Sequence, residues 1–147
     1  MSPRCKLSLG NGRYVQVTEW KGELRVDIRE WDNDLPTKKG ISLNLMQYKN
    51  LLAGIETFID PAMTENKNES FHLGANVFAK VKKNNPCVDI RQFWTPLSEA
   101  VPTKKGLCMR PSEYAALKTF VPEIEKLLPE LENVIPCYMQ DDHANQE

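Results

Sequence analysis

The segment VDIREW at residues 26–31 returns as VDIRQF at residues 88–93. The segment PTKKGISL at residues 36–43 returns as PTKKGLCM at residues 102–109. The first pair is offset by 62 residues and the second by 66, so the later copy has four extra residues between the two blocks. Because several blocks recur in the same order, the chain is predicted to contain two copies of one structural unit.

Each copy has the pattern of β-strands followed by a helix. Residues 13–20 (RYVQVTEW) and 23–31 (ELRVDIREW) alternate between apolar and polar side chains, so each is predicted to be a strand with one buried face. Lys21 and Gly22 between them fit a hairpin turn. After a polar loop, a further short strand is expected at residues 41–43.

The hydrophobic period then changes from two residues to that of a helix. In the first copy, apolar side chains follow helical spacing over residues 48–59. Asn44 is predicted to be the N-cap of this helix, and Pro61 is predicted to end it. In the second copy, Pro111 suits the first helical turn, and Pro122 is expected to kink or break the helix.

A copy of about 60 residues buries little surface alone, so the two copies are predicted to pack together, helix against helix. The expected result is an intramolecular pseudo-dimer with approximate two-fold symmetry. The predicted organisation is a first repeat at residues 1–60, a linker at 61–70, a second repeat at 71–130 and an acidic, flexible tail at 131–147.

The formal net charge of −1 hides an uneven distribution of charge. Residues 1–44 carry a charge of +2 and residues 71–110 carry +5, whereas the rest of the chain carries −8. Positive charge therefore lies in two separate blocks, one in each copy. This pattern allows a nucleic-acid partner despite the nearly neutral total.

Several classes of protein are not favoured by the sequence. The four cysteines are not spaced as CxxC and there are only two histidines, so no metal site is predicted, and reduced thiols are expected. No dinucleotide-binding, P-loop or nucleophile-elbow motif occurs. We therefore predict that the chain is not an enzyme and needs no cofactor. No apolar run is long enough to cross a membrane, and the segment MSPRCKLSLGNGR lacks the apolar region of a secretory signal.

The repeated segments resemble the transcriptional coactivator positive cofactor four family, the p15-type coactivators. The run GRYVQVTEWKGELRVDIREW followed by KKGISLN resembles the C-terminal DNA-binding domain of that family, and VDIRQFW followed by PTKKG resembles it again. The likeness covers residues 7–59 and 71–128. It implies an α+β fold in which each copy forms a curved four-stranded antiparallel sheet followed by a helix.

The resemblance also implies a function and a set of partners. It implies binding of single-stranded or melted DNA across the two sheets, together with a role beside the RNA polymerase II transcription or replication machinery. It implies a nuclear location or, for a viral chain, the site of viral DNA transcription or replication. The chain departs from the family by fusing two copies, by lacking a Ser-rich acidic N-terminal region, by a shorter loop after Trp31, and by KKNNP in place of WKG in copy two. These losses leave open whether the two channels have equal affinity. Because the fused copies already satisfy each other, we expect a monomer in solution.

Sequence-tolerant binding of a single strand requires aromatic faces that stack on bases and cations that follow the phosphates. Candidates in the first copy are Arg13, Trp20, Lys21, Arg25, Arg29, Trp31, Lys38, Lys39 and Asn44. Candidates in the second copy are Lys80, Lys82, Lys83, Arg91, Trp94, Lys104, Lys105 and Arg110, with Phe78 and Phe93 as further outward aromatics. Asp27 and Asp89 also recur, and because a carboxylate repels phosphate, we expect them to orient Arg or Lys side chains on the same face or to satisfy backbone groups.

Alternatives remain open at this level. Each aromatic could pack on a neighbouring strand, and each Lys or Arg could simply be solvated. The chain could be a protein-interaction adaptor whose nucleic-acid surface has decayed, an interpretation favoured by the nearly neutral charge, by Glu23 beside the turn and by the missing WKG. It could also bind single-stranded RNA, since stacking does not read the sugar.

Overall fold

The computed structural model describes residues 2–94 and 101–134. Each repeat contains four antiparallel strands in sequential order. The first sheet consists of β1 (Ser2–Gly10), β2 (Arg13–Trp20), β3 (Glu23–Asp32) and β4 (Leu35–Asn44). The second consists of β5 (Glu69–Gly74), β6 (Val77–Lys82), β7 (Asn85–Trp94) and β8 (Val101–Met109). The predicted α+β fold with a four-stranded sheet in each copy is confirmed.

Helical segments follow each sheet. After the first come α1 (Leu45–Gly54), a π-helical segment η1 (Ile55–Ile59) and α2 (Asp60–Glu65). After the second come α3 (Pro111–Leu127) and a short 3-10 helix η2 (Pro129–Asn133). Asn44 caps α1 as predicted, and Pro111 lies in the first turn of α3 as predicted. Within the described residues, no helix combines the length and apolarity needed to cross a membrane.

The prediction that Pro61 ends the first helix is wrong. The backbone widens into a π-helical segment, where Asp60 donates its N–H to the carbonyl of Ile55 five residues earlier. Pro61 then enters in the first turn of α2, a position where a missing N–H costs little. As a result, the predicted linker at 61–70 shrinks to residues 66–68, between α2 and β5.

Three further boundaries differ from the predictions. Helix α3 runs through Pro122 to Leu127 without a break, because buried Leu117 and Ile124 hold it on the core before and after the proline. Strand β4 begins at Leu35 and not at residue 41, since its first half pairs with the end of β3. The predicted tail overlaps η2, and its remainder at residues 135–147 lies outside the described residues.

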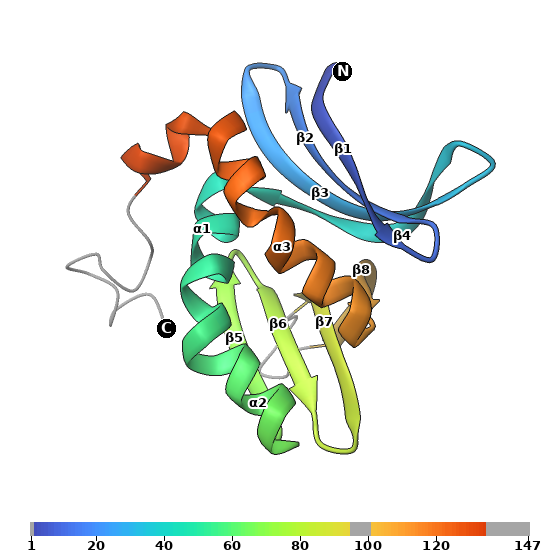
Figure 1. Ribbon diagram of the computed structural model, residues 1–147, viewed down its shortest axis with the longest axis vertical. Helices are drawn as coiled ribbons and strands as arrows, with labels where there is room; N and C mark the ends of the chain where they lie inside the picture. The colour runs from blue at the N-terminus through green and yellow to red at the C-terminus, as the bar shows by residue number, and fades with distance from the viewer. Residues whose placement is uncertain (1, 95–100, 135–147) are drawn as a thin grey trace.

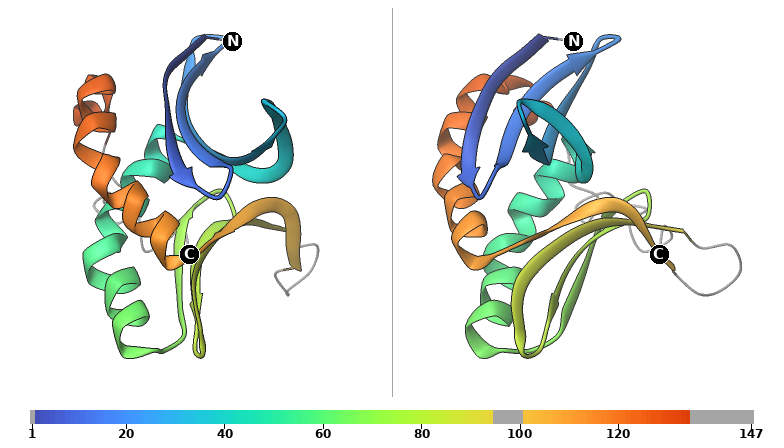
Figure 2. Two further views of the ribbon diagram at one scale, coloured as in Figure 1. Left: turned by 45° about the vertical axis from the view of Figure 1, so that its right-hand side comes forward. Right: turned by 90° about the vertical axis from the view of Figure 1, so that its right-hand side faces the viewer.

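The helices lie on one side of the molecule, and the curled ends of β3–β4 and β7–β8 lie on the other (Figures 1 and 2). Helix α1 of the first repeat packs on β5 of the second, helix α3 of the second packs on β1 of the first, and β4 contacts β8. One hydrophobic core contains residues of both repeats, including the equivalent residues Tyr48 and Tyr114. The two repeats therefore pack on one another within a single chain.

Candidate nucleic-acid interface

The outward face of the first sheet carries a groove with a volume of about 710 Å³. Its lining residues are Gln16, Thr18, Arg25, Asp27, Arg29, Trp31, Pro36, Thr37, Lys38 and Ser42. On β2 and β3 they alternate with fully buried residues such as Val17, Val26 and Ile28. Because side chains alternate across a strand, this groove faces away from the hydrophobic core, and we call it groove one.

The second sheet carries an equivalent hollow, groove two, with a volume of about 470 Å³. Its lining residues are Lys80, Lys82, Asn85, Cys87, Asp89, Arg91, Phe93, Pro102 and Cys108. Asp89, Arg91 and Phe93 occupy the positions that Asp27, Arg29 and Trp31 occupy in groove one. The repeated DIR motif therefore lies at the same place on each sheet.

An arginine clamped by an aspartate lies in both grooves. Arg29 donates through Nε and Nη2 to the Asp27 carboxylate at 3.0–3.3 Å, and through Nη1 to the carbonyl of Thr37 at 2.8 Å. Arg91 makes the same bonds to Asp89 and to the carbonyl of Thr103. The prediction that the two aspartates orient cations on their own face is confirmed.

The repeated TKK segment forms a bulge beside this arginine. In the first sheet Arg29 lies opposite Gly40 and Trp31 lies opposite Pro36, so residues 37–39 face the single residue Glu30. Thr37 closes the bulge: its hydroxyl donates to the carbonyl of Glu30 at 2.8 Å and accepts from the N–H of Lys39 at 3.2 Å. Thr103 makes the same two bonds, to Gln92 and Lys105, at 2.7 and 3.2 Å. The bulge leaves two adjacent lysines exposed on each sheet.

The glycine that ends each TKKG motif is required by the arginine that crosses it. A Cβ atom at Gly40 would lie 2.8 Å from side-chain carbons of Arg29, and one at Gly106 would lie 2.6 Å from Cγ of Arg91. Neither distance is tolerated without movement of the strand or the arginine. The DIR and TKKG motifs are thus two parts of one structure, which explains why they recur together.

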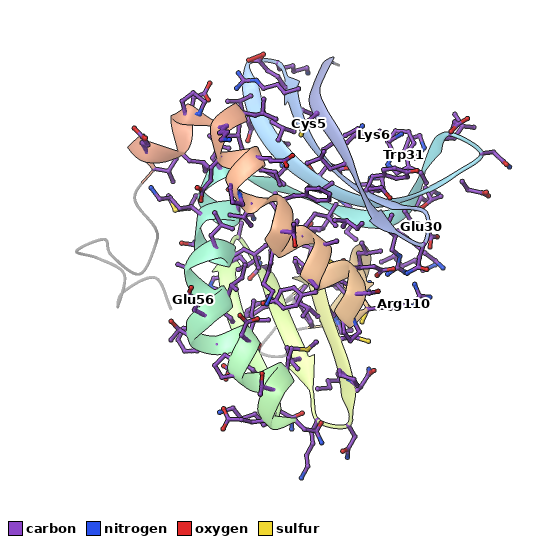
Figure 3. The ribbon with its side chains drawn as sticks, in the orientation of Figure 1. Cys5, Lys6, Glu30, Trp31, Glu56 and Arg110 are labelled. Carbon is purple, nitrogen blue, oxygen red and sulfur yellow. The ribbon has the colours of Figure 1, made fainter. Side chains whose placement is uncertain are left out.

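A lysine ammonium lies over an aromatic ring in each groove. In groove one, Lys6 Nζ is 3.4 Å from the ring centroid of Trp31 and 4.7 Å from that of Tyr14. In groove two, Lys80 Nζ is 4.2 Å from the centroid of Phe93. Figure 3 shows Lys6 and Trp31 side by side above the first sheet. These are cation–π contacts, and they keep a positive charge beside each aromatic.

The two lysines lie on non-equivalent strands, Lys6 on the first strand of its sheet and Lys80 on the second strand of the other sheet. Lys6 on β1 pairs with Gln16 on β2, and the equivalent pair in the second sheet is Ser70 with Lys80. Sequence reasoning identified Lys80 but missed Lys6. The alternation in KLSLG, with Leu9 buried, could have placed Lys6 on the outward face.

Three predicted nucleic-acid residues lie outside the lining of both grooves, and one of them, Arg13, joins the repeats. Arg13 Nη1 lies 2.9 Å from Oε1 of Glu113 and also donates to the carbonyl of Cys108. Arg110 Nη1 lies 2.9 Å from Oε2 of the same carboxylate. The Asn44 side chain accepts the N–H of Gln47 at 2.8 Å as the cap of α1. All three side chains thus make contacts at helix starts, outside both grooves, and Arg110 stays 57% exposed there.

Glu113 is the centre of this contact and is fully buried. Besides the two guanidinium groups, it accepts bonds from the Arg110 N–H at 2.9 Å and the Asn11 amide at 2.8 Å. Burial alone raises the pKa of the Glu113 carboxyl, but these hydrogen bonds and the Arg13 charge outweigh it and hold the pKa below its ordinary value. The carboxylate is therefore ionised and paired at neutral pH.

The remaining predicted residues lie around the two grooves. Lys21 and Lys83 occupy the β2–β3 and β6–β7 turns, and Lys39 and Lys105 are exposed in the bulges. Trp94 ends β7 with 63% of its surface exposed. Trp20 ends β2 opposite Glu23, and its side chain lies outside the described part of the chain.

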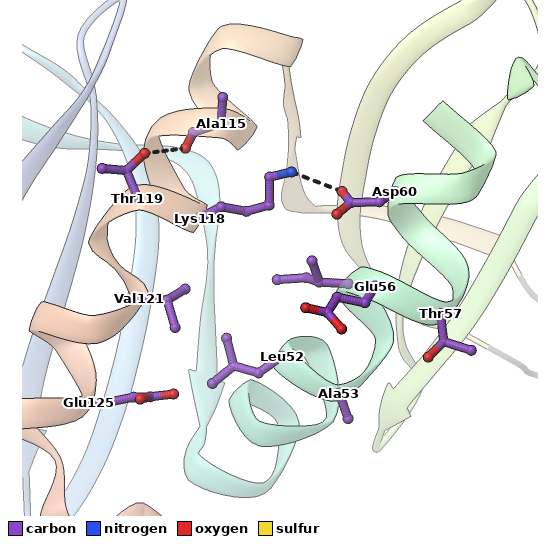
Figure 4. A pocket seen from close by; sticks show the side chains of 11 residues that line it. Leu52, Ala53, Glu56, Thr57, Asp60, Ala115, Lys118, Thr119, Val121 and Glu125 are labelled. Atoms are coloured by element: carbon purple, nitrogen blue, oxygen red, sulfur yellow. Dashed lines mark hydrogen bonds and ion pairs between the residues drawn. The ribbon is translucent and has the colours of Figure 1, made fainter. Parts of the chain in front are cut away.

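A further hollow of about 860 Å³ lies between α1–η1 and α3, on the helical side (Figure 4). Its lining includes the carboxylates of Glu56, Asp60 and Glu125, and its Lys118 is paired with Asp60 at 3.0 Å. Carboxylates repel phosphate, so this hollow is a poor nucleic-acid site. No group of three His, Cys, Asp or Glu residues that could hold a metal occurs in residues 2–94 or 101–134.

Comparison with known proteins agrees with this geometry. The sequence model of the family Transcriptional Coactivator p15 (PC4) matches the chain twice, at residues 7–54 and 71–120. This chain belongs to the PC4 family. Each PC4 match begins in the first strand of a repeat and ends in its helix, so each match contains one complete groove.

A curated relative is the RNA polymerase II transcriptional coactivator of Drosophila melanogaster, which is 50% identical over 44 residues. The aligned region is 27% of this PC4-family chain and 40% of the fly protein. The chain thus matches less than half the length of that relative. No solved structure matches the chain significantly.

Proposed function

We propose that this chain binds single-stranded or melted DNA in grooves one and two and acts as a transcriptional coactivator. The observation that carries the proposal is the recurrence, on both sheets, of one clamped arginine, one TKKG bulge and one lysine above an aromatic ring. Two copies that diverged elsewhere have kept the arginine and the bulge with the same hydrogen bonds, and each places a lysine above its ring from a different strand. Membership of the PC4 family supports the coactivator role and a nuclear site of action.

Each part has a physical role in holding an unpaired strand. The exposed lysines of the bulges, Lys38 and Lys39 with Lys104 and Lys105, would neutralise phosphates along the rim of each groove. Trp31 and the exposed Trp94 offer ring surface to bases, and base–aromatic stacking contributes about 1–3 kcal/mol per base. An unpaired strand presents its base faces, whereas a duplex keeps them within its own stack. Single-stranded DNA is therefore the preferred ligand.

The proposal is tested by titrating the full chain into labelled oligonucleotides at low salt. Single-stranded and bubble DNA should bind more tightly than duplex of the same sequence. The logarithm of the binding constant should fall with the logarithm of salt concentration, with a slope of about −0.7 per phosphate neutralised. No binding at low salt, or preference for duplex, would refute the proposal, and tighter binding of RNA than DNA would redirect it to single-stranded RNA.

A set of variants assigns that binding to the grooves. Replacing Lys38, Lys39, Lys104 and Lys105 by Gln should abolish most of the affinity, because phosphate contacts dominate sequence-tolerant binding. The control is Lys67→Gln with Lys126→Gln, which removes two exposed lysines from the helical side and is compared with each groove pair of two lysines separately. Equal losses in both sets would show that binding reflects only the total charge of the chain.

A further inference from the structure

We propose that groove two is the primary nucleic-acid site and that groove one is a weaker, secondary site. This inference rests on the proposed function and adds an order of filling to it. In groove one, Arg25 lies 3.1 Å from the Glu23 carboxylate, Arg29 lies 3.0 Å from Asp27, and Lys39 lies 4.0 Å from Glu30. Three of the cations that would meet phosphate are therefore already paired with carboxylates.

The cations of groove two are largely without such partners. Arg91 is paired with Asp89 at 3.0 Å. The other cations in and around groove two form no ion pair with any residue that the structure describes. They are Lys80, Lys82, Lys83, Lys104 and Lys105. Among the described residues, groove two thus offers several ammonium groups without a carboxylate partner, and Lys80 lies over the rings of Phe93 and Phe78.

Comparison of equivalent positions shows that most of the charge-changing substitutions favour groove two. Glu23 and Glu30 of the first repeat correspond to Asn85 and Gln92 of the second, which removes two carboxylates. Gln16 and Thr18 on the floor of groove one correspond to Lys80 and Lys82, which adds two cations. Two changes favour groove one: Ser70 replaces Lys6, and Cys87 replaces Arg25, a cation that Glu23 already pairs.

The physical consequence is a difference in how each groove meets phosphate. A phosphate entering groove one must share Arg25, Arg29 and Lys39 with carboxylates that repel it, whereas one entering groove two displaces mainly water and counterions. Release of counterions drives this kind of binding and makes it depend on salt. Groove two should therefore fill first and show the steeper salt dependence.

The chain offers a matched pair of variants for the test, because Lys38–Lys39 and Lys104–Lys105 occupy the same bulge in the two repeats. Full-length chain is titrated with a single-stranded oligonucleotide of about 8 nucleotides, short enough to occupy one groove at a time. Two binding steps are expected, a tight step at groove two and a weak step at groove one. Lys104→Gln with Lys105→Gln should weaken the tight step about tenfold, whereas Lys38→Gln with Lys39→Gln should change it less than about threefold.

Equal losses, or a greater loss from the groove one pair, would overturn the ranking of the grooves while leaving the proposed function intact. Absence of any binding by the unmodified chain would instead refute the proposed function. In the reverse direction, Glu23→Asn gives groove one the residue of the second repeat. It should tighten the weak step and leave the tight step unchanged, and a change confined to the tight step would contradict the assignment.

A native reporter in groove two gives an independent measurement. Cys87 lines this groove, where the first repeat has Arg25. Burial raises the pKa of the neighbouring Cys108 thiol to about 11, so Cys108 stays protonated and reacts slowly at neutral pH. Oligonucleotide below one equivalent should slow alkylation of Cys87 by N-ethylmaleimide but not that of Cys5 in the first sheet. Unchanged alkylation of Cys87 with bound oligonucleotide would contradict the proposal.

Discussion

Glu113 and Gln47 occupy equivalent positions near the starts of α3 and α1, yet they join the repeats by different chemistry. Gln47 Nε2 donates to the carbonyl of Gly74 at 3.0 Å, a neutral bond to the first turn of the second sheet. Glu113 meets the first turn of the first sheet through Asn11 and the charged Arg13. The second repeat has Val77 where the first has Arg13, so an ion pair joins the repeats at Glu113 but not at Gln47.

Replacing Glu113 by Gln should therefore destabilise the chain. Arg13, with 12% of its side chain exposed, would keep Glu30 at 3.6 Å but lose the closer Glu113 carboxylate at 2.9 Å, and weakening the pairing of a buried polar group costs about 1–3 kcal/mol. Urea denaturation measures the change, with Glu125→Gln on the exposed face of the same helix as the control. A loss no larger than that of the control would contradict the role assigned to Glu113.

The same substitution has a predicted dependence on pH. The pKa of Glu113 is lowered in the folded chain, so its stabilisation is fully present above the ordinary glutamate pKa of about 4.3 and is lost as the pH falls towards the folded pKa. The difference in stability between the unmodified chain and Glu113→Gln should shrink on acidification. A difference that stays constant through that range would show that the carboxylate charge is not responsible.

Individual residues were the least predictable level of this structure. The types of residue in the grooves follow from alternation along the strands, which is why Arg25, Arg29 and Trp31 were predicted correctly to lie on the outward face. Arg13 was assigned to DNA because nothing local shows that it meets Glu113, which is 100 residues away in the chain. A contact of that kind depends on how the two repeats pack, and no periodicity contains that information.

The bulge is the element that presents the paired lysines, and its threonine holds it closed. Thr103→Ala removes the hydroxyl bonds to Gln92 and Lys105, at a cost of about 1 kcal/mol, and should loosen the lysine pair and weaken oligonucleotide binding. Thr103→Ser keeps the hydroxyl and is the matched control. Binding and urea denaturation check the prediction, and equal behaviour of the two variants would show that the hydroxyl does not shape the bulge.

Helix α3 contains a residue that costs it a backbone hydrogen bond. Pro122 is exposed inside the helix and has no N–H to donate, so Pro122→Ala should raise the free energy of unfolding by about 1–3 kcal/mol. Pro111→Ala, in the first turn of the same helix, should have little effect because no helical bond is missing there. A decrease in stability for Pro122→Ala would mean that the proline ring contributes packing that the helix needs.

The elements themselves were largely predictable, because alternation and helical spacing identify strands and helices from local sequence. The errors occurred where packing compensates for a local breaker. Pro61 predicts a helix end and Pro122 a kink or break, but a π-helical segment accommodates the first and buried neighbours hold the helix through the second. The early start of β4 was missed because the polar LPTKK segment carries no apolar alternation.

At the scale of the whole molecule, one core joins the two repeats, with α1 and α3 each lying on the opposite repeat. The repeat in the sequence was sufficient to predict this arrangement, since neither copy could bury its apolar faces alone. The chain should therefore unfold in one cooperative transition that is independent of protein concentration, and it should be a monomer by light scattering. Two separate transitions, or a stable dimer at low micromolar concentration, would contradict the closed arrangement.

The division of charge also belongs to this scale. The grooves carry the lysines of both repeats, whereas the hollow between the helices is lined by Glu56, Asp60 and Glu125 (Figure 4). If the chain binds nucleic acid as proposed, this distribution of charge should direct it to the sheet faces and leave the helical side uncovered.

The most direct test is to map an unlabelled single-stranded oligonucleotide on the full chain by two-dimensional NMR of backbone amides. Residues on β2–β4 and β6–β8 that line the grooves should shift, those of groove two at the lower oligonucleotide concentration, while α1 and α3 stay unchanged. Shifts centred on the helices, or none on the outward sheet faces at saturating oligonucleotide, would contradict the account.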